Sequence, residues 1–506
     1  MLFNSYIFIL FFLPVSVIGY FVINKYKKQE KSTADLWWLF LMSSWFYAYA
    51  NPVCLILLLL SIGVSYFIST KINASRDQSH LKEAKRWMVS GVVFNVALLI
   101  YFKYFEFFIS NLNQLFQQDW TVKNLIVPLG ISFFTFKQIA YIVDCYREKE
   151  QVRYQWIEYA NYVMFFPQLI SGPIGLHYEF IPQMRDNKRK TVNYDNLSQG
   201  LYALALGLGK KVLIADSLSK MVAVGYADVS ALTGTASWFV MLMYTMQIYF
   251  DFSGYSDMAL GIEKMLNLDP VLNFHSPYKA KTVGEFWNRW HMSLTRFFTR
   301  YVYIPLGGSR KGKLRTYVNT MIVFLISGLW HGANWTFILW GFLHGLFMTM
   351  EKIVKDMWKS VVGFKIENPI ILFFGKVIGT IYTFLFVNLA WVFFRASSIE
   401  DAALLIRKLS ITGGYMSSAI MEKANDLVEV RVLTRLGMDG IIDAYPILPC
   451  VVIVGVLIFG VFFMRNTQEK IKTERYGIWR SVITIILMVW SIMSFADVSE
   501  FLYFNF

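Results

Sequence analysis

Long apolar runs, separated by short loops rich in Lys and Arg, repeat from one end of the chain to the other. With their flanks they are long enough to cross about 30 Å of hydrocarbon. They cover Leu2–Ile23, Leu55–Ile68, Met88–Ile109, Leu125–Val143, Trp238–Phe252, Tyr317–Trp330, Thr336–Met350, Ile370–Phe394, Ile447–Phe463 and Val482–Phe495, with Trp37–Ala50 as a shorter run. The pattern predicts an all-α polytopic membrane protein with about 11 or more transmembrane helices. It predicts one integral-membrane unit, residues 1–506.

Composition supports this prediction. Of 506 residues, 56% are hydrophobic and 16% are charged, whereas roughly 25% are charged in an average soluble chain. So few charges cannot cover a soluble surface, and the same numbers exclude a disordered chain or a secreted disulfide scaffold. The net charge of +14 is distributed over the short loops, as the positive-inside rule requires. The expected partner is therefore the lipid bilayer and not nucleic acid.

The basic loops also predict the orientation of the chain. Lys25 and its neighbours place the loop after the first span in the cytoplasm, and Arg465–Arg480 places the loop before the last span there too. Both termini are then extracytoplasmic. Residues 396–446 are an extracytoplasmic loop, and helices are expected over Glu400–Ser410 and Met421–Arg435.

One apolar segment, Tyr159–Gly175, is interrupted by Pro and Gly residues. Basic loops flank it on both sides, so it is predicted to be re-entrant, with a kinked span as the alternative. Irregular backbone at membrane depth must be covered by protein or line a cavity.

A histidine lies deep in another apolar run. His331 stands in Leu329–Trp335, between two tryptophans, Trp330 and Trp335, that are predicted to line an apolar cavity. Gly328 and Gly332 would let a ligand or a helix approach closely. Asn334 is three residues further on, where its amide would fix the imidazole tautomer. Ionisable groups inside a membrane usually face a cavity and serve a function.

A second polar cluster lies in Glu285–Leu294. Trp287 and Asn288 are predicted to share a helical face with His291. Basic side chains that could hold an anionic acyl donor follow at Arg289, Arg296 and Arg300. The alternative is an interfacial helix whose basic groups extend towards water. The histidines and cysteines show no spacing typical of a metal site, so no metal is expected.

Together these segments resemble a known family. Phe286–Leu294 and Leu329–Trp335 are similar to the two signature segments of the membrane-bound O-acyltransferase (MBOAT) family. Phe166–Ile174, Asp251–Asp257 and Tyr303–Arg310 resemble the subgroup that contains the alginate O-acetylation protein and the teichoic-acid D-alanyl transferase.

The resemblance implies an MBOAT fold, with re-entrant and interfacial helices around a central funnel and a catalytic core over residues 100–345. It implies that His331 is the catalytic histidine and that His291 is the second motif residue in the same cavity. The donor would be a cytoplasmic thioester, either acetyl-CoA or an acyl carrier, with no tightly bound cofactor. The implied partners are an extracytoplasmic SGNH-hydrolase-type acetyltransferase and a polysaccharide synthase or export complex, in the inner membrane of a bacterium.

The chain ends in a tail, residues 496–506, with the pattern F-x-Y-x-x-F. A similar pattern ends the small acyl-carrying peptide of the D-alanylation system, so the resemblance makes Tyr503 a candidate acyl acceptor. The alternative is an interfacial aromatic anchor.

The resulting functional prediction is an O-acetyltransferase that modifies an extracytoplasmic polysaccharide of the alginate, cellulose or peptidoglycan type. His331 is expected to act as general base. D-alanyl transfer to teichoic acid is one alternative. A transporter or flippase whose histidines line a substrate path is another.

Overall fold

The computed structural model describes residues 1–27, 32–121, 125–148, 152–361, 367–411, 413–473, 477–495 and 501–502. Within these ranges every regular element is helical, which confirms the predicted all-α class. The first helices are α1 (Leu13–Tyr26), α2 (Ala34–Ala48), α3 (Pro52–Asp77), α4 (Leu81–Leu99), α5 (Phe105–Phe116), α6 (Ile131–Arg147), α7 (Trp156–Met164), α8 (Phe166–Leu169) and α9 (His177–Arg185).

The remaining helices complete the chain. The middle ones are α10 (Tyr194–Leu208), α11 (Asp216–Ala227), α12 (Gly234–Met265), α13 (Val283–Trp287), α14 (Met292–Phe298), α15 (Lys313–His331), α16 (Trp335–Val361) and α17 (Pro369–Arg395). The last are α18 (Ile399–Leu409), α19 (Ser418–Asn425), α20 (Val428–Leu433), α21 (Asp439–Ala444), α22 (Leu448–Phe463), α23 (Thr467–Thr473) and α24 (Ile478–Met493).

Short 3₁₀ and π-helical segments link several of these helices. The 3₁₀ turns are η3 (Asn187–Lys190), η5 (Val229–Ala231) and η6 (Pro277–Lys279). The π-helical segments are η1 (Phe8–Phe12), η2 (Ile100–Tyr104), η4 (Gly209–Ala215), η7 (Thr299–Tyr303) and η8 (Thr434–Met438).

Among the described residues, 5 helices are long and apolar enough to cross a membrane: Phe8–Tyr26, Pro52–Asp77, Leu81–Phe116, Trp335–Trp358 and Pro369–Arg395. A sixth span is formed if Val428–Ala444 and Leu448–Phe463, bent by 104°, count as one. Several other apolar runs fold into helices that are shorter, such as α2 and α6. The multi-pass character is confirmed, and the count of about 11 spans stays a prediction.

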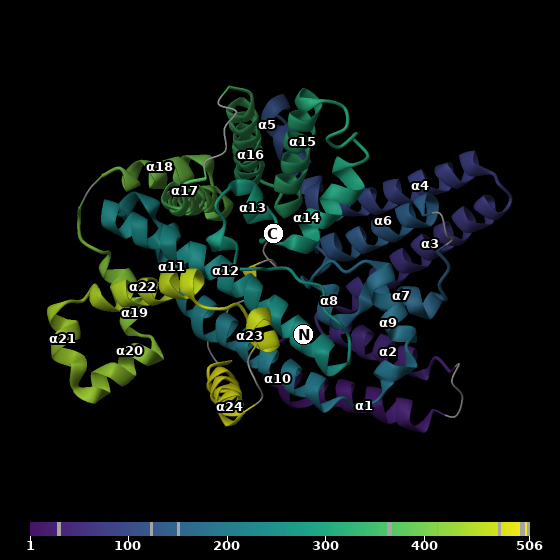
Figure 1. Cartoon of the computed structure of the whole chain (residues 1–506), viewed down its shortest axis with the longest axis horizontal. Helices are drawn as coiled ribbons and strands as arrows, with labels where there is room; N and C mark the ends of the chain where they lie inside the picture. Colours follow the sequence, from purple (N-terminus) through teal and green to yellow (C-terminus); the bar gives the residue numbers. More distant parts are fainter. Residues whose placement is uncertain are drawn as a thin grey trace.

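The long helix α12 runs through the middle of the molecule against α10 (Figure 1). The helices α3, α4 and α6 pack together on one side of it, α15 and α16 stand side by side above it, and α18–α22 form the opposite side. Glycines allow the closest of these approaches. A Cβ atom built on Gly207 would lie 2.7 Å from the carbonyl oxygen of Gly254, so any larger side chain would push α10 and α12 apart.

Local sequence sets where several helices begin. The Asn51 side chain accepts hydrogen bonds from the backbone N–H groups of Val53 and Cys54, and Pro52 occupies the first turn of α3. Asn368 and Pro369 repeat this arrangement at the start of α17. An Asn cap followed by Pro satisfies the first unpaired N–H groups and removes one of them.

The segment Tyr159–Gly175 is a broken helix that is buried throughout. Helix α7 ends at Met164, the short α8 follows, and the chain is then irregular to Leu176. The ammonium group of Lys137 on α6 donates to the Tyr162 carbonyl at 3.0 Å and to Gln168 Oε1 at 2.8 Å. Protein therefore covers the irregular backbone, as its membrane depth would require. The re-entrant course itself stays a prediction.

The loop at residues 396–446 carries helices α18 to α21. Helix α18 covers the predicted Glu400–Ser410 segment except for Ser410. The predicted Met421–Arg435 segment is formed by α19, α20 and the start of η8, with a break at residues 426–427. The Ser398 hydroxyl caps α18 by accepting from the Asp401 N–H at 3.0 Å.

Candidate active site

His331 is the last residue of α15, and its ring lies in an aromatic cage. The helix ends there because Gly332 adopts an extended conformation (φ −164°, ψ 151°). The imidazole centroid lies 4.7 Å from the Trp330 ring, 5.0 Å from Trp340 on α16 and 5.1 Å from Phe394 on α17. The residue is 2% exposed. Apolar walls of this kind keep water from a reacting group.

His291 is buried in the turn between α13 and α14 and has a left-handed backbone (φ 44°). Its Nδ1 lies 3.2 Å from Asn273 Oδ1. The Ser293 hydroxyl and backbone N–H donate to the same oxygen, which identifies this atom as an acceptor. His291 Nδ1–H must therefore donate to it, and this leaves the lone pair on Nε2.

Trp330 joins the two histidines. Its ring centroid lies 6.1 Å from the His291 ring and 4.7 Å from the His331 ring. Phe133 and Phe136 from α6 cover the same indole, with centroids at 5.7 and 5.3 Å. Two segments forty residues apart in sequence thus meet in one aromatic cluster at the centre of the fold.

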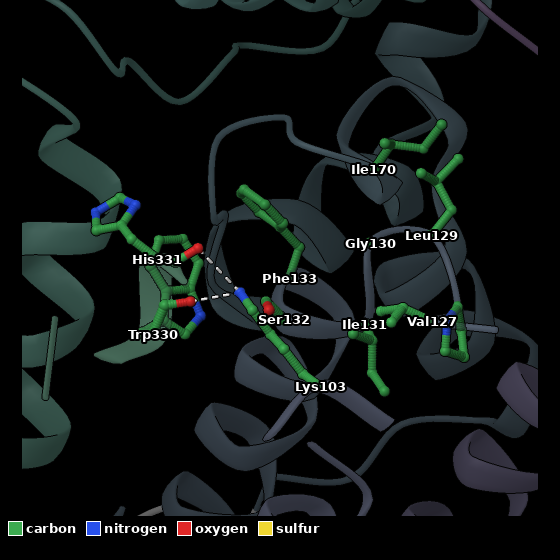
Figure 2. A pocket seen from close by; sticks show the side chains of 11 residues that line it. Lys103, Val127, Leu129, Gly130, Ile131, Ser132, Phe133, Ile170, Trp330 and His331 are labelled. Carbon is green, nitrogen blue, oxygen red and sulfur yellow. Dashed lines mark hydrogen bonds between the residues drawn. The ribbon is translucent and has the colours of Figure 1, made fainter. Parts of the chain in front are cut away.

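A pocket of about 70 Å³ lies next to this cluster, lined by Lys103, Trp330, His331, Ile170 and residues 127–133. Lys103 Nζ donates to the carbonyl oxygens of Trp330 at 2.5 Å and of His331 at 3.3 Å. Figure 2 shows these two oxygens turned towards the lysine, whereas the His331 imidazole projects to the other side of the helix end.

A larger pocket of about 350 Å³ is lined by α13, α14, α15 and α16. Trp287 and Asn288 lie on its wall, together with Phe324 and Ser327. Ser327 precedes His331 by about one helical turn on α15.

The structure corrects two predicted cavity residues after His331. Because α15 stops at His331, Asn334 lies beyond the helix and does not share a face with the imidazole. Its Oδ1 accepts the Thr336 N–H at 3.0 Å near the start of α16. Trp335 is 55% exposed and donates to Asn111 Oδ1 at 2.9 Å, so it does not wall the cage.

The predicted helical face of Trp287, Asn288 and His291 is also wrong. Helix α13 ends at Trp287 and α14 begins at Met292, with His291 in the reversed turn between them. The Trp287 indole instead donates to Nδ1 of His344 at 3.1 Å. Both residues are buried.

The three predicted donor-binding arginines each pair with a carboxylate. Arg289 binds Glu285 at 2.8 Å, and Arg296 binds Glu179 at 2.5 Å and also the Ile174 carbonyl. Arg300 pairs with Asp144 and Glu148. Burial opposes ionisation of Glu285, but hydrogen bonds from the Lys281 N–H and the Arg289 guanidinium outweigh it and lower the pKa of this carboxyl.

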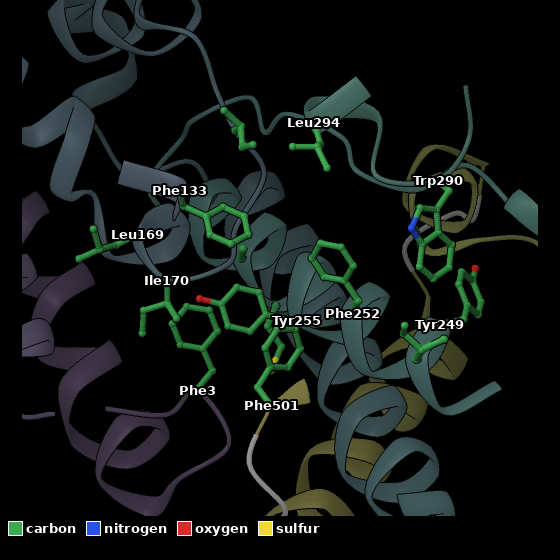
Figure 3. Packing of buried hydrophobic residues seen from close by; sticks show 14 of the residues in the cluster. Phe3, Phe133, Leu169, Ile170, Tyr249, Phe252, Tyr255, Trp290, Leu294 and Phe501 are labelled. Carbon is green, nitrogen blue, oxygen red and sulfur yellow. The ribbon is translucent and has the colours of Figure 1, made fainter. Parts of the chain in front are cut away.

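The described part of the carboxyl-terminal tail enters the core. Phe501 is buried, with its ring 4.8 Å from Tyr255 on α12, and the Leu502 N–H donates to Asp251 Oδ2 at 3.0 Å. Asp251 also pairs with Lys211 at 2.7 Å. Figure 3 shows Phe501 beside Tyr255 and Phe252, and the Phe252 ring lies 4.8 Å from His291. Tyr503 lies outside the described residues.

Sequence reasoning missed four residues of this site: Lys103, Asn273, Trp340 and His344. Each contacts a predicted residue only through the tertiary fold. Two signals were available: Lys103 lies inside the apolar run Met88–Ile109 and His344 inside Thr336–Met350, where ionisable groups are costly.

The fold and the paired histidines define a class of membrane enzyme, and the comparisons agree. The model of the MBOAT, membrane-bound O-acyltransferase family matches residues 129–392. The chain belongs to this family and is an O-acyltransferase.

Several relatives align with most of the chain. It is 36% identical to the peptidoglycan O-acetyltransferase of Helicobacter pylori over 100% of this chain and 98% of the relative. It is 34% identical to the probable alginate O-acetylase AlgI of Pseudomonas aeruginosa over 88% of this chain and 81% of the relative. The chain is also 30% identical to the teichoic acid D-alanyltransferase of Bacillus subtilis, but the match covers 45% of this chain and 59% of the relative.

Proposed function

We propose that the protein O-acetylates an extracytoplasmic polysaccharide, with His331 as the general base. The observation that carries this proposal is the placement of His331 at the end of α15, in an aromatic cage shared with His291 through Trp330. Peptidoglycan is the first polymer to test, because the relative that acts on it aligns with the whole chain.

The proposed reaction is an acyl transfer. His331 takes the proton from an acceptor hydroxyl, whose oxygen attacks the thioester carbonyl carbon. The C–S bond then breaks, and the leaving thiolate receives the proton from the imidazolium. The cage of Trp330, Trp340 and Phe394 excludes the water that would otherwise hydrolyse the thioester.

We propose that the donor arm enters through the 350 Å³ pocket between α13 and α16. Its wall is apolar at Phe324 and polar at Asn288 and Ser327, which suits a thioester arm with amide groups. The donor is acetyl-CoA or an acyl-carrier thioester. The three arginines do not support a phosphate site, since a donor phosphate would have to displace a carboxylate from each.

The acceptor side is proposed to involve the tail. Phe501 and Leu502 lie against α12 close to the His291 side of the cluster, and Tyr503 follows directly in sequence. Tyr503 would take the acetyl group and pass it to an SGNH-type partner working with the polymer synthase or export complex. Both termini would be extracytoplasmic, in the inner membrane of a bacterium.

Replacing the proposed base tests the assignment. His331→Ala should lower base-releasable acetate on purified peptidoglycan by about 100-fold or more, the scale of one general base, without reducing membrane-inserted protein. His80→Ala is the matched control, because His80 is exposed near the start of α4. Acetylation at the wild-type level in His331→Ala would reject the assignment.

A second measurement separates acyl chemistry from transport. The purified protein is incubated with acetyl-CoA and, separately, with an acetylated acyl-carrier protein, and thiol release is followed. Wild type should release thiol from one of the two and His331→Ala from neither. Release from neither by the wild-type protein would favour the transporter alternative.

A further inference from the structure

Lys103 is a lysine within an apolar membrane-length helix, and no carboxylate among the described residues forms an ion pair with it. It lies in the π-helical turn η2 between α4 and α5. Wide turns of this kind inside a helix frequently occur at functional sites. A lysine at this depth is costly unless its charge is used.

The charge is used on the end of α15. The last carbonyl groups of a helix have no partner inside the helix and carry partial negative charge. Lys103 Nζ binds two of them, those of Trp330 and His331. The ammonium therefore caps the helix on one side, while the imidazole projects to the other (Figure 2).

Helix α5, which continues directly from η2, also holds the chain that follows His331. Asn111 on α5 accepts the Trp335 indole N–H at 2.9 Å, and Phe107 packs on the same indole with centroids 6.0 Å apart. Contacts from η2 and α5 thus secure the turn after His331 both before and after Gly332.

We propose that Lys103 is a positioning residue for acyl transfer, which fixes the backbone of Trp330 and His331 and thereby the direction of the His331 ring. The inference rests on the proposed function of His331. Lys103 lines the 70 Å³ pocket and binds the end of α15, and the proposal does not place it in contact with the reacting atoms.

Three variants of the protein test this inference. Lys103→Met removes the donors but keeps the length of the side chain, and Lys103→Arg keeps the donors and the charge. Lys279→Met is the matched control, since Lys279 Nζ donates to the Met464 carbonyl at 3.0 Å at the end of α22, away from the cage.

Acetate on peptidoglycan isolated from the cells is measured and divided by the amount of folded protein that is purified in detergent from the same cells. In Lys103→Met the acetate per folded protein should fall about 10- to 100-fold, which is the effect of a small misplacement of a catalytic group. Lys103→Arg should restore most of the rate, and Lys279→Met should match wild type. All three should unfold at similar temperatures.

Other outcomes overturn the inference. Lys103 is not a positioning residue if Lys103→Met transfers acetate at the wild-type level. The same conclusion follows if Lys103→Met and Lys103→Arg lose acetate transfer equally, or if the loss disappears when transfer is divided by the amount of folded protein. His331→Ala is run in parallel. If it too stays active, the proposed function fails; if it is inactive while Lys103→Met is active, only the role of Lys103 fails.

Discussion

His291 has a left-handed backbone, which residues with a side chain rarely adopt. Strain of this kind persists where the surroundings hold it and is common at functional sites. Here Asn273 supplies that hold, because its Oδ1 binds both His291 Nδ1 and Ser293. The amide thus controls both the turn and the tautomer.

We expect Asn273→Ala to lower acetyl transfer by about 10- to 100-fold, since the ring loses the partner that fixes its proton on Nδ1. The rate is measured as acetate released from peptidoglycan per folded protein. Asn388→Ala is the control, because Asn388 is equally buried but donates to the Phe384 carbonyl of its own helix. Equal rates in both variants would contradict a role for Asn273.

At the scale of elements, hydrogen bonds connect α14 with the broken segment, and an ion pair connects it with α9. Arg296 on α14 reaches Glu179 on α9 and the Ile174 carbonyl, and the Ser293 hydroxyl accepts the Ile174 N–H at 2.9 Å. The irregular chain after α8 is therefore tied to the helix that follows His291. We therefore expect Arg296 to support this architecture rather than to bind a donor.

A double-variant cycle on this pair tests that role. Arg296→Met and Glu179→Gln should each lower the free energy of unfolding, and the double variant should lose less than the sum, with a coupling of about 1 kcal/mol for a half-exposed pair. Unfolding is followed thermally in detergent. We expect the double variant to regain activity over Arg296→Met.

If Arg296 bound the donor instead, the result would differ. Removing Glu179 would release the guanidinium, so Glu179→Gln would keep its activity, while Arg296→Met and the double variant would be equally inactive. That pattern would return Arg296 to the donor site.

At the scale of the whole molecule, the first residues of the chain and the described part of the tail, Phe501 and Leu502, lie close together in the core. The Met1 ammonium group donates to the Phe46 carbonyl, and Phe3 stacks on Tyr255 at 4.7 Å. Phe501 contacts the same tyrosine. The described start and the described part of the tail thus meet on one residue of α12, next to Phe252 and the His291 side of the site.

We expect Tyr503→Phe to abolish polymer acetylation, because the phenol oxygen would be the acyl carrier. Mass spectrometry of the carboxyl-terminal peptide should find an acetyl adduct in wild type and none in His331→Ala. Tyr415→Phe is the control, since Tyr415 is 93% exposed. Full acetylation by Tyr503→Phe would leave the tail as an interfacial anchor.

The sequence by itself determined the class of protein and the two histidines. Apolar runs and basic loops are local features, and they suffice to predict helices in a bilayer. The two motifs around His291 and His331 sufficed for the family. The ends of helices were harder to predict. Asn334 does not share a helical face with His331, because Gly332 is extended and α15 ends at His331.

Only the tertiary structure decided which side chains serve those histidines. Lys103 is 228 residues from His331, and Asn273 is 18 from His291. Such contacts depend on how helices cross and where they end, and helical periodicity constrains neighbours only within about four residues. Buried polar groups that have no hydrogen-bond partner nearby in the sequence find one on a distant segment. The residues that support the histidines could therefore be identified only in the tertiary structure.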